Sequence, residues 1–331
     1  MSSAATVAPR SFELHGVELG VYAEDGAVID AMELRLRDFA SEEAPDPELR
    51  LEFVTADAPE AHAPPRAARP VYDTPHGTLH YLPDADLLLG RLGAVELRAE
   101  AGRGVARLRS PAFVGRDLYL ATHPLATISL MELLERRGRF ALHAACLASA
   151  TGEGVLLAGA SGAGKSTLAV ALAHSGMRFL SDDIVFLAPR PGSGTDPGEV
   201  RVLGFADTVG LTEHAAAHFP ELRPATEEPL PDGFPKRLHR SEDLFGVPAL
   251  SDCEPRALVF PTIAPGAPSR IAALDQGAAM LRLVPDVLLT HPAATHSHLR
   301  AIAALLRQVR CYRLSSGRDL ERAVALVRAV V

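Results

Sequence analysis

The loop Gly159-Ala160-Ser161-Gly162-Ala163-Gly164-Lys165-Ser166 lies between an apolar run, Val155–Ala158, and a helix-forming run, Thr167–Leu172. It matches the phosphate-binding P-loop pattern at each defining residue, and its flanks supply the strand and the helix that the pattern requires. Glycines let backbone N–H groups curl around phosphates, and the start of the helix adds partial positive charge. A chance glycine-rich turn is the competing interpretation, and the combination of strand, helix, lysine and serine disfavours it.

The pattern predicts a role for each residue of this loop in binding ATP with Mg²⁺. Lys165 would bring a full positive charge to the β- and γ-phosphates, and the Ser166 hydroxyl can ligate Mg²⁺. The predicted nucleotide-binding residues are Gly159, Ala160, Ser161, Gly162, Ala163, Gly164, Lys165, Ser166 and Thr167.

Two adjacent carboxylates, Asp182 and Asp183, follow shortly after Lys165. One helix and a short strand fit into the interval, so we expect this aspartate pair beside the phosphates. Neighbours on an extended strand point opposite ways, so their roles should differ. One would accept the proton of an attacking hydroxyl, and the other would hold Mg²⁺. A turn-forming or helix-capping pair is the structural alternative.

His143 and Arg237 are the remaining candidates. His143 lies in the apolar stretch Phe140–Cys146, where a lone histidine is commonly a core residue. Lys236 and Arg237 open a short basic run, which can be a solvated loop or can stabilise a transferring phosphoryl group. We take Arg237 as the catalytic candidate of the two.

The pattern strand–loop–helix–strand around the P-loop is a βαβ unit and predicts an α/β domain over residues 136–331. Residues 1–135 read as short alternating strands, interrupted by a Pro/Ala-rich loop from Ala56 to Pro70, and predict a smaller α+β domain of unknown role. The expected strands are 12–21, 50–54, 78–81, 87–92, 95–99, 105–109, 140–148, 154–158, 178–180, 184–187 and 311–314, and the expected helices are 124–136, 166–175, 299–309 and 320–330.

Composition excludes several classes of protein. Of the 331 residues 47% are hydrophobic and the formal net charge is −8, so the broad basic surface of a nucleic-acid binder is not expected. Three dispersed cysteines argue against a disulfide framework or a structural zinc site. No signal peptide and no apolar stretch of about 18 residues is found. We expect a cytoplasmic protein without a membrane or nucleic-acid partner, and the sequence leaves a homo-oligomer open.

His143, the P-loop and the aspartate pair, in this order and spacing, resemble the C-terminal kinase domain of HPr kinase/phosphorylase. Phosphoenolpyruvate carboxykinases share a similar loop and an early Asp pair. The segments 235–238, 256–260 and 311–314 resemble divergent HPr kinase-related proteins, some of which phosphorylate a serine on a small peptide. The resemblance implies a P-loop kinase core with Asp182 as catalytic base, Asp183 as its magnesium-side neighbour and His143 near the site.

Two features depart from that family. Its magnesium-binding Glu is not found, and the stretch Val202–Asp207 offers only Asp207 in its place. Residues 1–135 do not resemble the family's regulatory domain, which leaves a phosphorylase activity and HPr as substrate unsupported. We therefore expect a kinase that transfers the γ-phosphate of ATP to a hydroxyl, serine by resemblance, of a peptide or protein. A small-molecule kinase and a nucleotide-binding sensor or scaffold without turnover stay open as alternatives.

Overall fold

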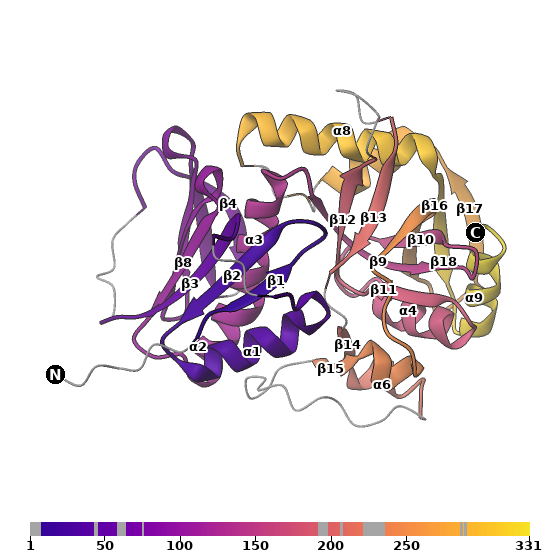
Figure 1. Ribbon diagram of the computed structural model, residues 1–331. Coiled ribbons are helices and arrows are strands. Elements are labelled where there is room, and N and C mark those ends of the chain that lie inside the picture. The colour runs from indigo at the N-terminus through magenta and orange to yellow at the C-terminus, as the bar shows by residue number, and fades with distance from the viewer. Residues whose placement is uncertain are drawn as a thin grey trace. The chain divides into compact units, whose positions relative to one another are not determined.

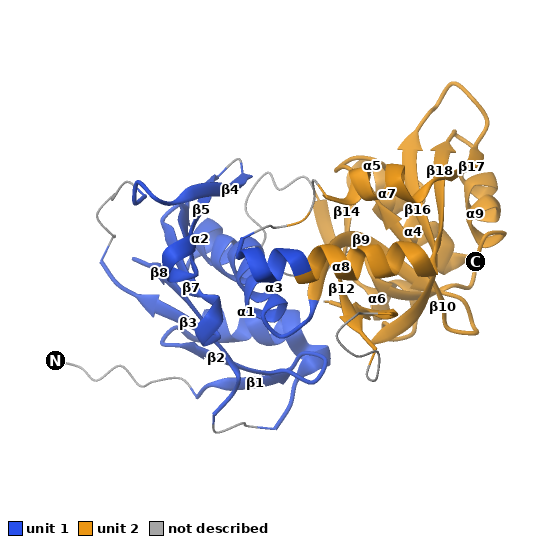
Figure 2. Cartoon of the chain, turned by 90° about the horizontal axis from the view of Figure 1, so that it is seen from above, with its two compact units in different colours: residues 1–139, 228–233, 288–296 blue, residues 140–227, 234–287, 297–331 orange. Residues whose placement is uncertain are grey.

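The computed structural model describes residues 8–42, 46–57, 64–74, 76–190, 198–205, 208–220, 236–284, 287 and 290–331. These residues form two compact units (Figure 2). Unit 1 runs to Arg139 and also contains residues 290–296, although these lie far along the chain. Unit 2 holds the other described residues. The predicted domain border, after residue 135, did not anticipate that unit 1 takes a segment from the C-terminal part of the sequence.

Unit 1 contains a sheet of eight described strands in the order β1-β2-β3-β8-β7-β6-β5-β4 (Figure 1). β3 pairs in parallel with β2 and β8, and the other neighbours are antiparallel. The strands are β1 (Arg10–Glu13), β2 (Glu18–Ala23), β3 (Leu49–Thr55), β4 (Arg69–Thr74), β5 (Gly77–Leu82), β6 (Leu87–Leu92), β7 (Val95–Glu100) and β8 (Val105–Ser110).

The helices of unit 1 are α1 (Gly26–Leu36), α2 (Gly115–Leu120) and α3 (Ala126–Glu135), with short 3-10 turns at Arg37–Phe39, Pro83–Ala85 and Ala101–Arg103. The Asp25 side chain caps α1 by accepting from Ala27 N at 3.0 Å. A π-helical turn, Ala121–Leu125, joins α2 to α3 and contains Pro124, which has no N–H to donate. The expected helix 124–136 is therefore the second half of a longer helical segment.

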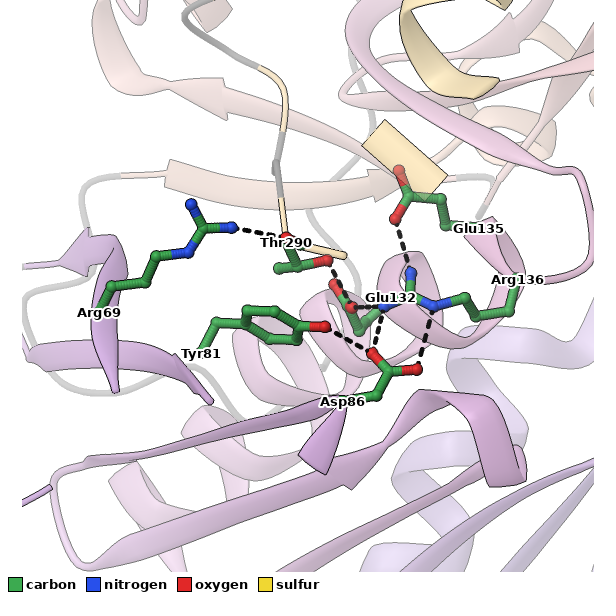
Figure 3. A network of polar contacts seen from close by, with 7 residues as sticks. All are labelled: Arg69, Tyr81, Asp86, Glu132, Glu135, Arg136 and Thr290. Carbon is green, nitrogen blue, oxygen red and sulfur yellow. Dashed lines mark hydrogen bonds and ion pairs between the residues drawn. The ribbon is translucent and has the colours of Figure 1, made fainter. Parts of the chain in front are cut away.

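A buried polar network crosses unit 1 (Figure 3). Arg136, which directly follows α3, donates to Asp86 and Glu132 at 2.7 Å each and to Glu135 at 2.8 Å. The hydroxyl of Thr290 donates to Glu132 at 2.7 Å, so the C-terminal segment of the unit is tied to α3. Burial raises the pKa of Glu132 to about 7, although Arg136 and Thr290 act in the opposite direction.

The strands of unit 2 are β9 (Phe140–Ala148), β10 (Glu153–Ala158), β11 (Arg178–Ser181), β12 (Ile184–Pro189), β13 (Val200–Gly204), β14 (Thr208–Thr212), β15 (Lys236–Arg240), β16 (Asp252–Ile263), β17 (Arg270–Leu274) and β18 (Arg310–Ser316). The main sheet has the order β10-β9-β12-β13-β16-β18-β17, and β10 also pairs in parallel with β16. β14 and β15 form a separate two-stranded ribbon. The helices are α4 (Lys165–His174), α5 (Glu213–Ala216), α6 (Ser241–Phe245), α7 (Gln276–Leu283) and α9 (Leu320–Arg328), and α8 (Pro292–Gln308) begins in unit 1 and ends in unit 2.

The segment β10–α4–β11 brings the P-loop to the main sheet of unit 2. Both β10 and β11 pair antiparallel with β9, one on each side, so they run parallel to each other with β9 between them. Leu168, Ala169 and Leu172 of α4 pack on Val155 and Leu157 of β10 in the core. This packing holds α4 against β10 and thereby positions the P-loop that connects them.

The mixed α/β class is confirmed, as are the expected strands and helix around the P-loop. The single strand expected over 12–21 is wrong. His15 and Gly16 adopt positive φ, and Leu14 and Val17 exchange backbone hydrogen bonds, so the chain turns into the hairpin β1–β2. The expected loop ends early because β4 begins at Arg69. None of the described helices is long and apolar enough to cross a bilayer.

Candidate functional site

The P-loop connects β10 to α4 through three glycines with positive φ. Gly159, Gly162 and Gly164 have φ values of 138°, 79° and 90°. A side chain at these positions would be strained by the backbone itself, because L residues rarely adopt these angles. The residues at the start of α4 carry backbone N–H groups without helical partners, and these form the anion-binding end of the helix.

Lys165 is the first residue of α4 and is 7% exposed. Its Nζ donates to the carbonyl oxygens of Gly159 at 2.6 Å and Ala160 at 3.3 Å. The ammonium group is therefore held over the loop, which is where the P-loop pattern requires the charge for the β- and γ-phosphates.

The aspartate pair interrupts a strand path along one edge of β9. β11 pairs Ser181 with Cys146, and β12 resumes by pairing Ile184 with His143, in the same register. The Ser181 hydroxyl lies 2.6 Å from the Ile184 carbonyl oxygen, across the interruption. Asp182 and Asp183 thus lie in the gap between the two strands and have no strand partner of their own among the described residues.

Asp182 is 5% exposed, and its Oδ2 accepts from the backbone N–H of Gly210 at 3.1 Å. Its Oδ1 is buried and has no hydrogen-bond partner among the described residues. Burial and the charge of Asp183 raise the pKa of Asp182 to about 6, against the effects of Gly210, Ser166 and Lys236. A carboxyl with a pKa in this range can accept a proton near neutral pH.

Asp183 has an exposed side chain and pairs with His143. Its Oδ1 lies 2.9 Å from His143 Nε2, and the two side chains are 73% and 31% exposed. Desolvation works toward a higher pKa, but the hydrogen bond from His143 and the charges of Lys236 and Lys165 outweigh it and lower the pKa of Asp183. The two carboxylates therefore have different environments, although they lie in a bend between β11 and β12 and not on the extended strand that the sequence suggested.

β9 places His143 between the other parts of the site. His143 pairs with Ile184, directly after the aspartate pair, and its neighbour Ala144 pairs with Ala158, directly before the P-loop. Three separate sequence motifs therefore meet around a single strand.

The ribbon β14–β15 supplies one group that sequence reasoning missed and one that it passed over in favour of Arg237. One is Gly210, whose N–H holds Asp182. The other is Lys236, whose charge lowers the pKa of both aspartates. Arg237, the residue chosen from the sequence, pairs with Leu211 and is exposed, on the face of the ribbon opposite to Lys236. Because side chains alternate between the two faces of a strand, Lys236 and Arg237 lie on opposite faces of β15, and this alternation could have distinguished them in the sequence. The catalytic role of Arg237 stays a prediction.

The donor set fits Mg²⁺. The hydroxyl of Ser166 and the carboxylate of Asp183 are hard oxygen ligands, and the side chain of Asp183 is exposed. No cluster of three or more His, Cys, Asp or Glu side chains suited to a metal occurs among the described residues. This is consistent with Mg²⁺, which commonly binds one or two carboxylates together with water and phosphate oxygens. Asp207 lies outside the described residues.

Comparisons with known proteins give little help with the activity. No protein-family model and no curated protein matches the sequence. Among solved structures, the chain is similar to the Hpr(Ser) kinase/phosphatase from Coxiella burnetii, at 13% sequence identity and a TM-score of 0.31. That similarity covers 57% of this chain and 88% of the other. A likeness at this TM-score is too weak to support a conclusion, so the function has to follow from the residues of the site.

Proposed function

We propose that this chain is a Mg²⁺-dependent kinase that transfers the γ-phosphate of ATP to a hydroxyl, serine in the favoured case, of a peptide or protein. The observation that carries the proposal is the meeting of the P-loop, the aspartate pair and His143 around β9. A P-loop alone is compatible with many nucleotide-binding proteins. A buried carboxyl with an unpartnered oxygen, adjacent to it, is what proton transfer from an attacking hydroxyl requires.

In this proposal catalysis consists mainly of positioning and charge neutralisation. The loop residues from Gly159 to Thr167 and the ammonium group of Lys165 bind the phosphates. Ser166 and Asp183 would hold Mg²⁺, which when bound neutralises phosphate charge. The Oδ1 of Asp182 takes the proton of the acceptor hydroxyl.

His143 has a positioning role in the proposal. Through its hydrogen bond it fixes the side chain of Asp183 and, by lowering the pKa of that carboxyl, keeps it ionised. An ionised Asp183 in turn favours the protonated form of Asp182, since its charge raises the pKa of Asp182. Neighbouring groups whose pKa values are shifted in opposite directions are found at sites where one group transfers a proton and the other binds a charge.

The kinship with HPr kinase-related peptide kinases is part of the proposal and rests on the same residues in the same order. The peptide or protein partner, the cytoplasmic location and the absence of a nucleic-acid partner are proposed from the composition and the motif. A homo-oligomer is compatible with all of them.

The test is phosphoryl transfer by the full chain, with γ-labelled ATP, Mg²⁺ and a peptide library containing serine, threonine or tyrosine, beside a panel of small alcohols. We expect label on serine peptides and none with Asp182→Asn. Label on small alcohols alone would favour the small-molecule kinase. ATP binding without transfer to any acceptor, or to water, would favour the sensor or scaffold and refute the kinase.

A further inference from the structure

Lysine is nearly absent from this protein. Of the 33 Lys and Arg residues, only Lys165 and Lys236 are lysines. At solvated surface positions either cation serves, and there the sequence uses arginine throughout. At a phosphate site the two differ, because an ammonium group is a compact charge with three donors whereas a guanidinium is a wide planar fork. A retained lysine is therefore informative in this sequence, and one of the two is the P-loop lysine.

The second lysine acts on the same carboxylates as the first. The charges of Lys165 and Lys236 both lower the pKa of Asp183, and Lys236 also lowers that of Asp182. The two residues are 71 positions apart in the sequence and come from α4 and from the ribbon β14–β15. The fold thus gathers all the lysine of the chain at one site.

The ribbon is shaped to let the Lys236 side chain reach this position. Lys236 pairs with Thr212, and its side chain lies diagonally across the strand over Gly210. A Cβ added to Gly210 would be 3.2 Å from Lys236 Cδ and 3.7 Å from its Nζ. The backbone N–H of the same Gly210 donates to Asp182. The missing side chain at residue 210 therefore makes room for the lysine directly beside the contact that holds the buried aspartate.

Lys236 is not engaged as a structural ion pair. Its side chain is only half-buried, and within the described residues no hydrogen bond or ion pair is formed by its ammonium group. Its charge acts on the aspartate pair, which would repel an incoming γ-phosphate. A cation at this place offsets that repulsion, as basic residues do where phosphoryl groups are transferred.

We infer that Lys236 is a second phosphate-binding lysine of this site, which contacts the γ-phosphate of the bound nucleoside triphosphate. The inference rests on the proposed function, and it names the group that recognises the transferred phosphoryl. It also assigns to Lys236 the role that the sequence suggested for Arg237.

The test compares a triphosphate with a diphosphate, so it needs no phosphate acceptor. Calorimetry with Mg²⁺ would measure the affinities of the full chain for a non-hydrolysable ATP analogue and for ADP. For Lys236→Ala we expect triphosphate affinity to fall about 10- to 100-fold, the effect of losing one charge-assisted hydrogen bond. ADP affinity should stay within about twofold, since the P-loop that binds the β-phosphate is intact. Lys236→Arg should retain part of the preference, because it keeps the charge but not the geometry.

A matched control removes a positive charge elsewhere in unit 2. Arg310 is exposed at the start of β18 and pairs with Ala257, toward the opposite end of the parallel strands from the P-loop, so Arg310→Ala should leave both affinities unchanged. If the Lys236→Ala variant binds both nucleotides as tightly as the wild type, the inference is overturned and the proposed function stands. An equal loss for both nucleotides would also overturn it, since the lysine would then support the ribbon only. Failure of the wild-type protein to bind either nucleotide would instead refute the proposed function.

Discussion

Asp182→Asn should make the metal-free protein more stable at pH 8 while strongly lowering its turnover. Asp182 is buried beside another carboxylate, and its pKa rises from 3.8 to about 6 on folding. A folded-state pKa above the unfolded value means that the stabilising contribution is complete below pH 3.8. It is then lost as the pH rises through 6. A shift of about 2 units corresponds to ~3 kcal/mol of stability that the ionised side chain removes.

Asn is uncharged and can still accept from the N–H of Gly210, so the substitution removes the buried charge and retains the hydrogen bond. We expect the variant to exceed the wild type by ~3 kcal/mol at pH 8 and by about half of that at pH 5. Urea unfolding in EDTA at both pH values would measure the difference. Asp183→Asn is the comparison: folding favours the ionised form of Asp183 itself, because its pKa is lowered, and the substitution removes only the second of the two causes that raise the pKa of Asp182, so its effect should be smaller than that of Asp182→Asn. If Asp182→Asn is no more stable than the wild type at pH 8, the ionised Asp182 carboxylate does not lower the stability of the folded protein, and the reasoning is refuted.

Three further predictions concern the P-loop, the catalytic roles of the aspartate pair, and unit 1. Lys165→Ala should weaken Mg·ATP binding strongly by removing the charge at the β- and γ-phosphates, and unchanged affinity in calorimetry would contradict the P-loop assignment. In a transfer assay at saturating ATP, Asp182→Asn should lower kcat by about 10²–10⁴-fold at every Mg²⁺ concentration, whereas Asp183→Asn should be rescued by added Mg²⁺; the opposite pattern would reverse their roles. In unit 1, the stabilising contribution of Glu132 is complete below pH 4.5 and is lost as the pH rises through about 7. Glu132→Gln should therefore lose less stability than the wild type between pH 5 and pH 8, and an identical loss in urea unfolding would show that Glu132 does not ionise there.

Sequence alone was sufficient for the elements whose signals are local. The P-loop, its flanking strand and its helix follow from glycine spacing and an apolar run, and these are properties of adjacent residues. Asp182 and Asp183 do have different environments, but the extended strand from which this was predicted is a bend at these two residues.

Contacts that depend on pairing between distant segments could not be predicted. Gly210 and Lys236 reach the site only because β14 and β15 pair with each other, and neither strand has a strong local pattern. The choice between Lys236 and Arg237 requires knowing which face of the ribbon each occupies. A shift of the strand register by one residue would exchange the two faces. The hairpin β1–β2 was missed for a local reason, since His15 takes a positive φ that is uncommon for a residue other than glycine.

The bond between Thr290 and Glu132 joins residues 158 positions apart. A ribosome synthesises a chain in the N- to C-terminal direction, so α3 leaves it long before Thr290 exists. During that interval the Glu132 carboxyl has no hydroxyl donor from the later segment, and solvent takes its place. The N-terminal unit therefore completes its packing only after most of the second unit has been translated, while the second unit itself still awaits residues 297–331.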